Sequence, residues 1–131
     1  MRRIELITRE NTELVDITDK IKDIVRNEGA ISGICVVFTK HTTTGLIINE
    51  NEAALRSDII ALLNELIPKG GGYMHDRIDN NAHSHLRAMF LSSSVCIPID
   101  QANLMLGRWQ SILLVECDGP RKREVYVKVI Q

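Results

Sequence analysis

The sequence has no excess of charge of either sign. Its 16 lysine and arginine residues nearly balance its 17 aspartate and glutamate residues, so the formal net charge is −1. Proteins that bind nucleic acid usually carry an excess of positive charge, because they neutralise phosphates. We therefore expect no nucleic-acid partner.

Long apolar runs are also absent. A membrane-spanning helix needs roughly 18–20 consecutive apolar residues, and no stretch of the sequence approaches that length. The opening MRRIELITRE has no apolar segment of signal-peptide length, because Glu5 and Arg9 interrupt it. The sequence therefore predicts a cytoplasmic protein with no membrane partner.

Cysteine is scarce, and its pattern excludes common structural uses. The three residues, Cys35, Cys96 and Cys117, are odd in number and far apart, and they form no CxxC pair. Zinc ribbons need such pairs. Each cysteine lies within an apolar, strand-like run, so we predict three buried thiols that act as small apolar side chains.

The apolar patterns predict one α+β domain over residues 1–131. Strand patterns outnumber helical ones and do not alternate strictly with them, which favours a mixed or mostly antiparallel sheet. Strands are predicted in RIELIT, ELVDIT, ISGICVVFTK, TTTGLIINE, SVCIPI, NLML, WQSILLVEC and EVYVKVI, the first two as a hairpin.

Two main helices and a short third one are predicted between these strands. The first begins at a Thr18 cap and ends near Gly29, and the second runs from an Asn49 or Asn51 cap to Pro68. The third follows an Asn80 or Asn81 cap through AHSHLRAMFL. A long polar loop with three successive glycines precedes it, and loops of that length are often functional.

The four histidines lie in two polar segments. HDRIDNNAHSHL, residues 75–86, holds three of them, and His41 begins HTTTG at the end of a predicted buried strand. Histidine is the commonest metal ligand and the usual acid or base near neutral pH. Catalytic zinc sites typically use three such ligands and leave one position open. A metal site, a non-metal catalytic histidine and a merely solvated loop all remain open on these residues.

The spacing of His83 and His85 bears on which of them belongs to a common site. In a helix the two side chains lie about 200° apart, so only one can join the site. His85 begins the apolar turn HLRAMFL, so we expect it to face inward and His83 to lie outside the ligand set.

Three further features are open to two interpretations each. GPRKR, residues 119–123, is either a solvated hairpin tip or an anion-binding one. Glu50 is either a site residue or a favourable charge at a helix N-terminus. Trp109 is either a pocket wall or part of the core, and we expect core packing.

Four blocks in the same order resemble one known family. HTTTGLIINENE, HDRIDNNAHSHLRA, SSSVCIPI and LGRWQSILLVECDGPRKR cover roughly residues 35 to 125. Each block is weak alone, but the combination is specific. It resembles the YjbQ-like family, also called the secondary thiamine-phosphate synthase family.

The resemblance implies more than the residues alone. It implies a compact α+β fold, assembly as a homotrimer, and a secondary thiamine-phosphate synthase activity. The positions that the family marks fall on His41, Glu50, His75, Asp76, His85, Trp109, Gln110 and Glu116.

Together these observations lead to one hypothesis about function. It describes a metal-binding enzyme that acts on a small phosphorylated or heterocyclic substrate, with His41, His75 and His85 binding one divalent metal, expected to be zinc. The catalytic candidates are Glu50, Asp76 and Glu116, and the substrate-binding candidates are Trp109, Gln110, Arg121 and Arg123. The alternatives are a non-catalytic homotrimer that binds a metal or metabolite, and a metal-dependent hydrolase.

Overall fold

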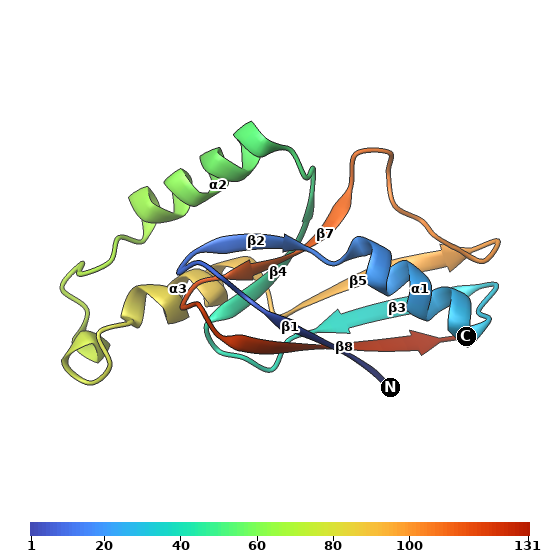
Figure 1. Cartoon of the computed structure of the whole chain (residues 1–131), viewed down its shortest axis with the longest axis horizontal. Coiled ribbons are helices and arrows are strands. Elements are labelled where there is room, and N and C mark those ends of the chain that lie inside the picture. The colour runs from blue at the N-terminus through green and yellow to red at the C-terminus, as the bar shows by residue number, and fades with distance from the viewer.

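Two antiparallel sheets form the body of the molecule in the computed structural model, which describes all residues from Met1 to Gln131 (Figure 1). The five-stranded sheet has the order β1 (Arg2–Ile7), β8 (Lys122–Ile130), β3 (Gly33–Phe38), β5 (Ser94–Asp100) and β6 (Asn103–Leu104). The three-stranded sheet has the order β2 (Glu13–Asp16), β7 (Ser111–Glu116) and β4 (Thr44–Asn49).

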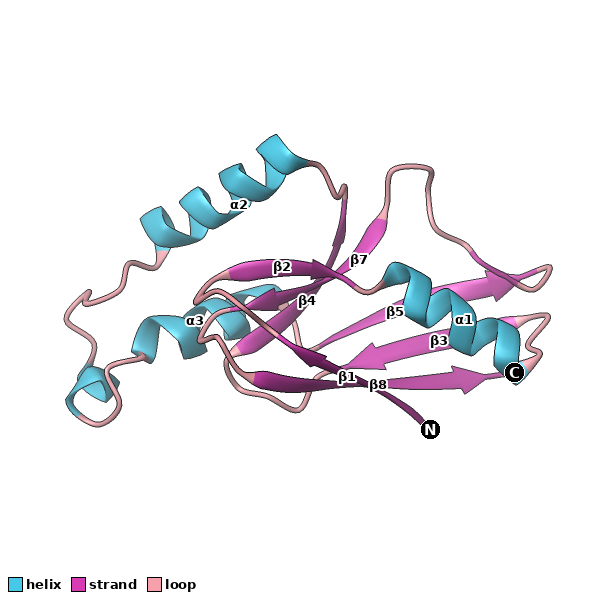
Figure 2. Ribbon diagram, viewed as in Figure 1, coloured by secondary structure: helices cyan, strands magenta, loops and turns pink.

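Three α-helices and one 3₁₀ turn accompany the sheets (Figure 2). They are α1 (Thr18–Glu28), α2 (Ala53–Leu66), η1 (Met74–Arg77) and α3 (Ala82–Leu91). The predicted α+β class, with two main helices and a short third one, is confirmed. None of these helices combines the length and the apolar character needed to cross a membrane.

The main core lies between the two sheets and α1. Fourteen buried apolar residues form it, with Ile21 from α1, Val37 from the large sheet and Leu114 from the small sheet among them. In α2, by contrast, only Leu63 is buried, and Leu62 and Leu66 are each about half exposed. The second helix therefore presents apolar surface that its own chain does not cover.

The predicted opening hairpin is wrong. β1 pairs with β8, and β2 pairs with β7, so the first two strands belong to different sheets. The segment between them bonds to the β7–β8 turn: Thr8 N–H donates to the Arg121 carbonyl at 2.9 Å, and Gly119 N–H donates to that of Asn11 at 3.0 Å. These non-local bonds replace the local pairing that the turn-like sequence suggested.

The helix caps also differ from those predicted. Ile17, and not Thr18, is the N-cap of α1, and the Thr18 hydroxyl instead accepts the N–H of Ile112 at 2.8 Å. Glu52 caps α2 in place of either predicted asparagine, because its carboxylate accepts two N–H groups of the first turn. Asn81 is the N-cap of α3, but its side chain makes no capping bond.

Two of the three cysteines are buried as predicted. Burial raises the pKa of Cys35 to about 11 and that of Cys117 to about 12. Cys96 is exposed, which corrects the prediction for that residue. In β5, Ile97 and Ile99 point into the core. Successive side chains of a strand point to opposite faces, so Cys96, next to Ile97, points outward.

One end of the small sheet collects the loops that carry polar residues. β4 and β7 are antiparallel with Thr44 opposite Glu116 and Asn49 opposite Ser111, so the start of β4 meets the end of β7. The helix α3 packs directly on β4, since a Cβ on Gly45 would lie 2.7 Å from Cβ of Leu91. At the other end of α3, Ser84 Oγ donates to the Cys117 carbonyl, which brings the N-terminus of α3 to the end of β7.

Candidate functional site

A polar pocket of about 390 Å³ lies where β4 begins and β7 ends. No apolar side chain lines it, and it takes side chains from the loop before β4, the N-terminus of α3 and the β7–β8 turn. We call it the histidine–arginine pocket. Its main lining residues are His41, Asn81, His85, Asp118, Arg121 and Arg123.

His41 is held in this pocket by the backbone of β8. Its Nε2 accepts the N–H of Glu124 at 3.0 Å, so the ring proton of the neutral imidazole resides on Nδ1. Burial, followed by the nearby Arg123 cation, lowers the pKa of His41 below its usual value. His41 is therefore a neutral imidazole with one nitrogen already bonded.

His75 and His85 contact each other at the edge of the pocket. Their ring centroids are 4.9 Å apart and the rings are nearly perpendicular, at 83°. The Nε2 of His75 is buried and has no hydrogen-bond partner, and the Asp79 carboxylate lies 3.8 Å from it. The structure thus brings His75 against His85, and His85 into the pocket with His41.

The three predicted metal ligands do not form a ligand set in this arrangement. No group of three His, Cys, Asp or Glu side chains in the chain is placed to hold a metal ion. The lone pair of His41 Nε2 is taken by the backbone of Glu124, and His75 and His85 have no third partner. The residues of a single chain therefore do not fit a three-ligand zinc site.

His83 and His85 occupy different environments. His85 lines the histidine–arginine pocket, and His83 lines a neighbouring pocket instead. However, His83 is only 3 % exposed, so the expectation that His85 is the inward-facing residue of the two is wrong. Its Nε2 lies 3.5 Å from Ser84 Oγ, and it shares the lining of that neighbouring pocket with Lys69. Burial, then the cations Arg87 and Lys69, lower its pKa.

Glu116 is a fully buried structural carboxylate. Its Oε1 accepts from Thr8 Oγ1 at 2.6 Å and Arg123 Nε at 2.8 Å, and its Oε2 accepts from Arg123 Nη2 at 2.5 Å and Asp118 N at 3.1 Å. Burial raises the pKa of Glu116, but these hydrogen bonds outweigh burial and leave it below the usual value. Both oxygens are occupied, and the carboxylate positions Arg123. The catalytic role of Glu116 stays a prediction.

Arg121 and Arg123 each keep one nitrogen free. Arg121 donates through Nε to the Asp118 carbonyl at 2.8 Å and through Nη2 to the Asp118 carboxylate at 3.0 Å. Arg123 uses Nε and Nη2 for Glu116, and Nη2 also donates to Thr43 Oγ1 at 2.8 Å. In both residues Nη1 has no protein partner, and both residues line the pocket.

Asp76 has a structural role. Its Oδ1 accepts the N–H of Ala82 at 2.9 Å, at the start of α3. It thereby supplies the helix cap that the Asn81 side chain does not provide. This bond fixes the 3₁₀ turn that carries His75 against the N-terminus of α3. The catalytic role of Asp76 stays a prediction.

The remaining predicted site residues lie at the opposite end of the small sheet. Glu50 follows β4, and Trp109 and Gln110 precede β7, next to the pair Asn49 and Ser111. The strand between the two ends is roughly 17 Å long at about 3.3 Å per residue. Trp109 is 64 % exposed, so the expectation of core packing is wrong. Within one chain these three residues do not reach the histidines.

Sequence reasoning missed five lining residues of the pocket: Lys40, Thr42, Thr43, Asn81 and Asp118. From the sequence, Asn81 is interpreted as a helix cap and Asp118 is assigned no site role. The two are bonded, with Asn81 Nδ2 donating to Asp118 Oδ2 at 2.9 Å. The signal for Asp118 was its place directly after a buried strand, in the segment that also contains Arg121. Asn81 could be found only from the contact between α3 and the β7–β8 turn.

Comparisons with known proteins agree with one another. The family model "UPF0047 protein YjbQ-like" matches residues 2–131. A UPF0047 protein of Archaeoglobus fulgidus is 45 % identical over 127 residues, covering 97 % of this chain and 98 % of the relative. One of Methanothermobacter thermautotrophicus is 42 % identical over 128 residues, covering 98 % and 90 %.

A solved structure extends the agreement from sequence to fold. The crystal structure of a YjbQ/UPF0047-family protein from Clostridium acetobutylicum superposes with a TM-score of 0.96 at 40 % identity, covering 99 % of this chain and 100 % of that one. The match therefore includes both sheets and all the loops that form the pocket. On sequence and on fold alike, this chain belongs to the YjbQ-like family of UPF0047 proteins.

Proposed function

We propose that the chain is an enzyme that acts on a small phosphorylated or heterocyclic substrate in the histidine–arginine pocket. One observation carries the proposal: His41 and His85 share a wholly polar cavity with two arginines. Guanidinium groups bind phosphate through charge-assisted hydrogen bonds. Imidazole is the side chain used most often for proton transfer near neutral pH.

The free atoms of the pocket suggest a role for each residue. The Nη1 groups of Arg121 and Arg123 bind phosphate or pyrophosphate oxygens, and His41 donates a hydrogen bond through Nδ1. His85 exchanges a proton with the reacting group. Thiamine-phosphate synthesis is a secondary reaction in this proposal, and in it the thiazole nitrogen attacks as pyrophosphate leaves. Positioned cations such as these two arginines stabilise the departing charge.

The variant Arg121→Gln tests the phosphate-binding role. We expect it to raise the KM for the phosphorylated substrates of thiamine-phosphate synthesis by about tenfold, because one charge-assisted hydrogen bond is lost. Arg26→Gln is the matched control, since Arg26 is an exposed arginine of α1 that pairs only with Asp23. Initial rates of thiamine phosphate formation at varied substrate concentration give the KM of each variant. Equal KM values in the two variants would refute the role of Arg121.

Zinc is the cofactor that we propose at the edge of this pocket. Two observations support it: the buried Nε2 of His75 has no protein partner, and the ring of His85 lies next to it. A complete site needs a further ligand, which requires either a movement of His41 away from Glu124 or a side chain from a second copy. When bound, zinc would act as a Lewis acid towards substrate oxygens.

Metal analysis of untagged protein, purified without added metal, tests the zinc proposal. We expect about one zinc per chain, and less than a tenth of that in His85→Ala, because zinc needs at least three protein ligands. Elemental analysis measures the zinc content. Fewer than about one zinc per three chains, with no effect of chelators, would exclude the metal. Zinc without any turnover would favour the non-catalytic homotrimer, and turnover of phosphate esters alone would favour the metal-dependent hydrolase.

We further propose that the chain works as a homotrimer in the cytoplasm. Fourteen large apolar side chains are exposed in the single chain, including Leu62 and Leu66 on α2. Assembly also gives Glu50, Trp109 and Gln110 a place in the site, because only a second copy can bring them near the histidines. The three free thiols suit the reducing conditions of the cytoplasm.

A further inference from the structure

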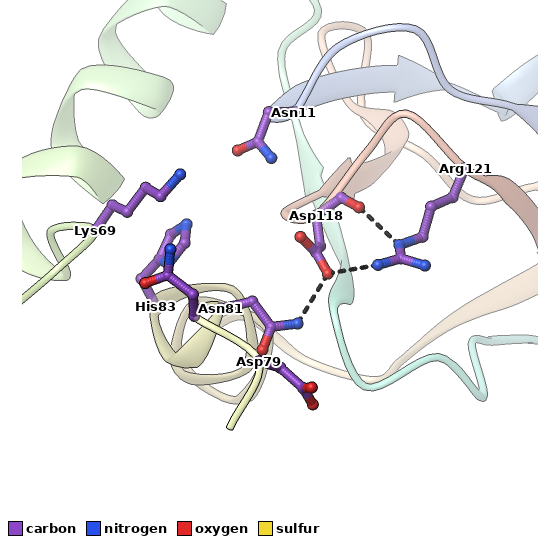
Figure 3. A pocket seen from close by; sticks show the side chains of 8 residues that line it. Asn11, Lys69, Asp79, Asn81, His83, Asp118 and Arg121 are labelled. Carbon is purple, nitrogen blue, oxygen red and sulfur yellow. Dashed lines mark hydrogen bonds and ion pairs between the residues drawn. The ribbon is translucent and has the colours of Figure 1, made fainter. Parts of the chain in front are cut away.

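A second polar pocket adjoins the histidine–arginine pocket and shares Asn81, Asp118 and Arg121 with it. Figure 3 shows the side chains that line it. Its volume is about 510 Å³, and no apolar side chain lines it. Lys69, from the loop after α2, and His83, from α3, line its far side. We call it the Lys69 pocket. Of its lining residues, the steps proposed above use only Arg121.

The His83 side chain presents an unused acceptor in this pocket. Ser84 Oγ donates its proton to the Cys117 carbonyl at 2.5 Å, so it can only accept from His83 Nε2, which lies 3.5 Å away. The ring proton of His83 is therefore on Nε2, and Nδ1 carries a lone pair. His83 is 97 % buried, and its Nδ1 has no hydrogen-bond partner. Buried polar atoms rarely stay unpartnered, so this atom points to a ligand.

Asn81 presents a second unused acceptor. Its Nδ2 donates to the Asp118 carboxylate at 2.9 Å, which fixes the orientation of the amide. The opposite atom, Oδ1, is buried and has no partner. His83 and Asn81, the two residues that carry these acceptors, both line the pocket. Two acceptors match a ligand with at least two hydrogen-bond donors, such as the hydroxyl groups of a polyol.

Lys69 supplies the charge of this pocket. It forms no ion pair with any carboxylate of the chain, whereas Asp118 is already paired with Arg121. The other carboxylate of the lining, Asp79, lies nearest to His75, and Figure 3 shows it pointing away from Lys69. The pocket also lies at the N-terminus of α3, where the helix dipole favours an anion. The unpaired cation therefore faces a space suited to a negative group.

We propose that the Lys69 pocket binds a small hydroxylated phosphate, such as a sugar phosphate. Lys69 binds the phosphate, and His83 Nδ1 and Asn81 Oδ1 accept hydrogen bonds from hydroxyl groups. The inference rests on the proposed function, because it takes the substrate to be phosphorylated. It places the sugar phosphate next to the reacting pocket, with Asn81, Asp118 and Arg121 shared between the two.

Equilibrium binding to metal-free protein tests this inference separately from catalysis and from zinc. Ribose 5-phosphate, ribose and inorganic phosphate are titrated in turn by calorimetry. We expect ribose 5-phosphate to bind at least tenfold more tightly than either fragment, because only it engages both Lys69 and the two acceptors. Lys69→Met should weaken its binding at least tenfold, while Lys20→Met on α1 should leave it unchanged.

Two variants at His83 separate the acceptor from a packing effect. His83→Asn keeps an acceptor oxygen at the position of Nδ1 and should retain most of the affinity for ribose 5-phosphate. His83→Phe keeps a ring without an acceptor, and it should reduce the preference over inorganic phosphate to less than threefold. No binding of ribose 5-phosphate at 10 mM, or equal binding by wild type and Lys69→Met, overturns the proposal. Neither result decides the role of Arg121 in the histidine–arginine pocket, which the turnover measurements test separately.

Discussion

Replacing Arg123 with methionine is expected to lower the free energy of unfolding by about 3–5 kcal/mol. Glu116 is fully buried, and Arg123 supplies two of the donors to its carboxylate. Without the guanidinium, a negative charge stays buried with only Thr8 and one backbone N–H as partners. Urea unfolding followed by circular dichroism measures the loss.

The double variant Glu116→Leu/Arg123→Met is the control for this effect. It removes both charges, and we expect it to recover most of the lost stability. Arg26→Met, which breaks the exposed pair with Asp23, should cost less than about 1 kcal/mol.

Because the pKa of Glu116 is lowered in the folded state, its stabilising contribution holds above the usual pKa of glutamate and disappears as the pH falls through the lowered value. If the free energies of unfolding of the wild type and of Arg123→Met differed by the same amount at pH 7 and at pH 3, the ion-pair explanation would be contradicted.

Introducing glutamates at Leu62 and Leu66 is expected to dissociate the proposed homotrimer into single chains at micromolar concentration. The two residues lie one helical turn apart on α2 and are 51 % and 53 % exposed. The next face of the helix, with Leu63, packs on the body of its own chain. Like charges buried in an interface are repelled and desolvated, which costs several kcal/mol. Sedimentation equilibrium measures the mass.

The double variant Ser57→Glu/Ala61→Glu is the matched control for assembly. It adds the same two charges to α2, on an exposed face about 100° away from Leu62. The control should keep the mass of three chains. A wild-type chain that sediments as a monomer would remove the homotrimer from the proposed function. A trimer that survives both pairs of glutamates would place the interface elsewhere than α2.

Local patterns in the sequence predicted most of the elements. The helical spacing of Ile21 and Val25, and the left-handed Gly29 that ends α1, need only neighbouring residues, and the structure reproduces both. The prediction of an opening hairpin failed because the strands with which β1 and β2 pair lie more than a hundred residues away, at Val125 and Val115. Strand order is set by which apolar faces bury each other, and one strand's pattern does not name its partner.

In the candidate site, too, features set by the local sequence were predictable, and features set by distant partners were not. Histidine content drew attention to residues 75–86, and His41 and His85 do share a pocket. The burial of His83 could not be foreseen, because it depends on how α3 docks on residues far away in the sequence, such as Cys117. The separation of Glu50, Trp109 and Gln110 from the histidines follows from the antiparallel pairing of β4 with β7. The family pattern names these three residues together with the histidines, but a sequence pattern carries no information about the distance between them in the fold.

The buried carboxylate of Glu116 also sets the order of events during synthesis. Its hydrogen bond to Thr8 joins residues 108 positions apart, and its partner Arg123 lies in the last strand. The histidine–arginine pocket therefore cannot form until the residues of β8 have left the ribosome. Contacts of such long sequence separation form slowly. We expect the pocket to mature after translation, and chains shortened at the C-terminus before β8 to lack it altogether.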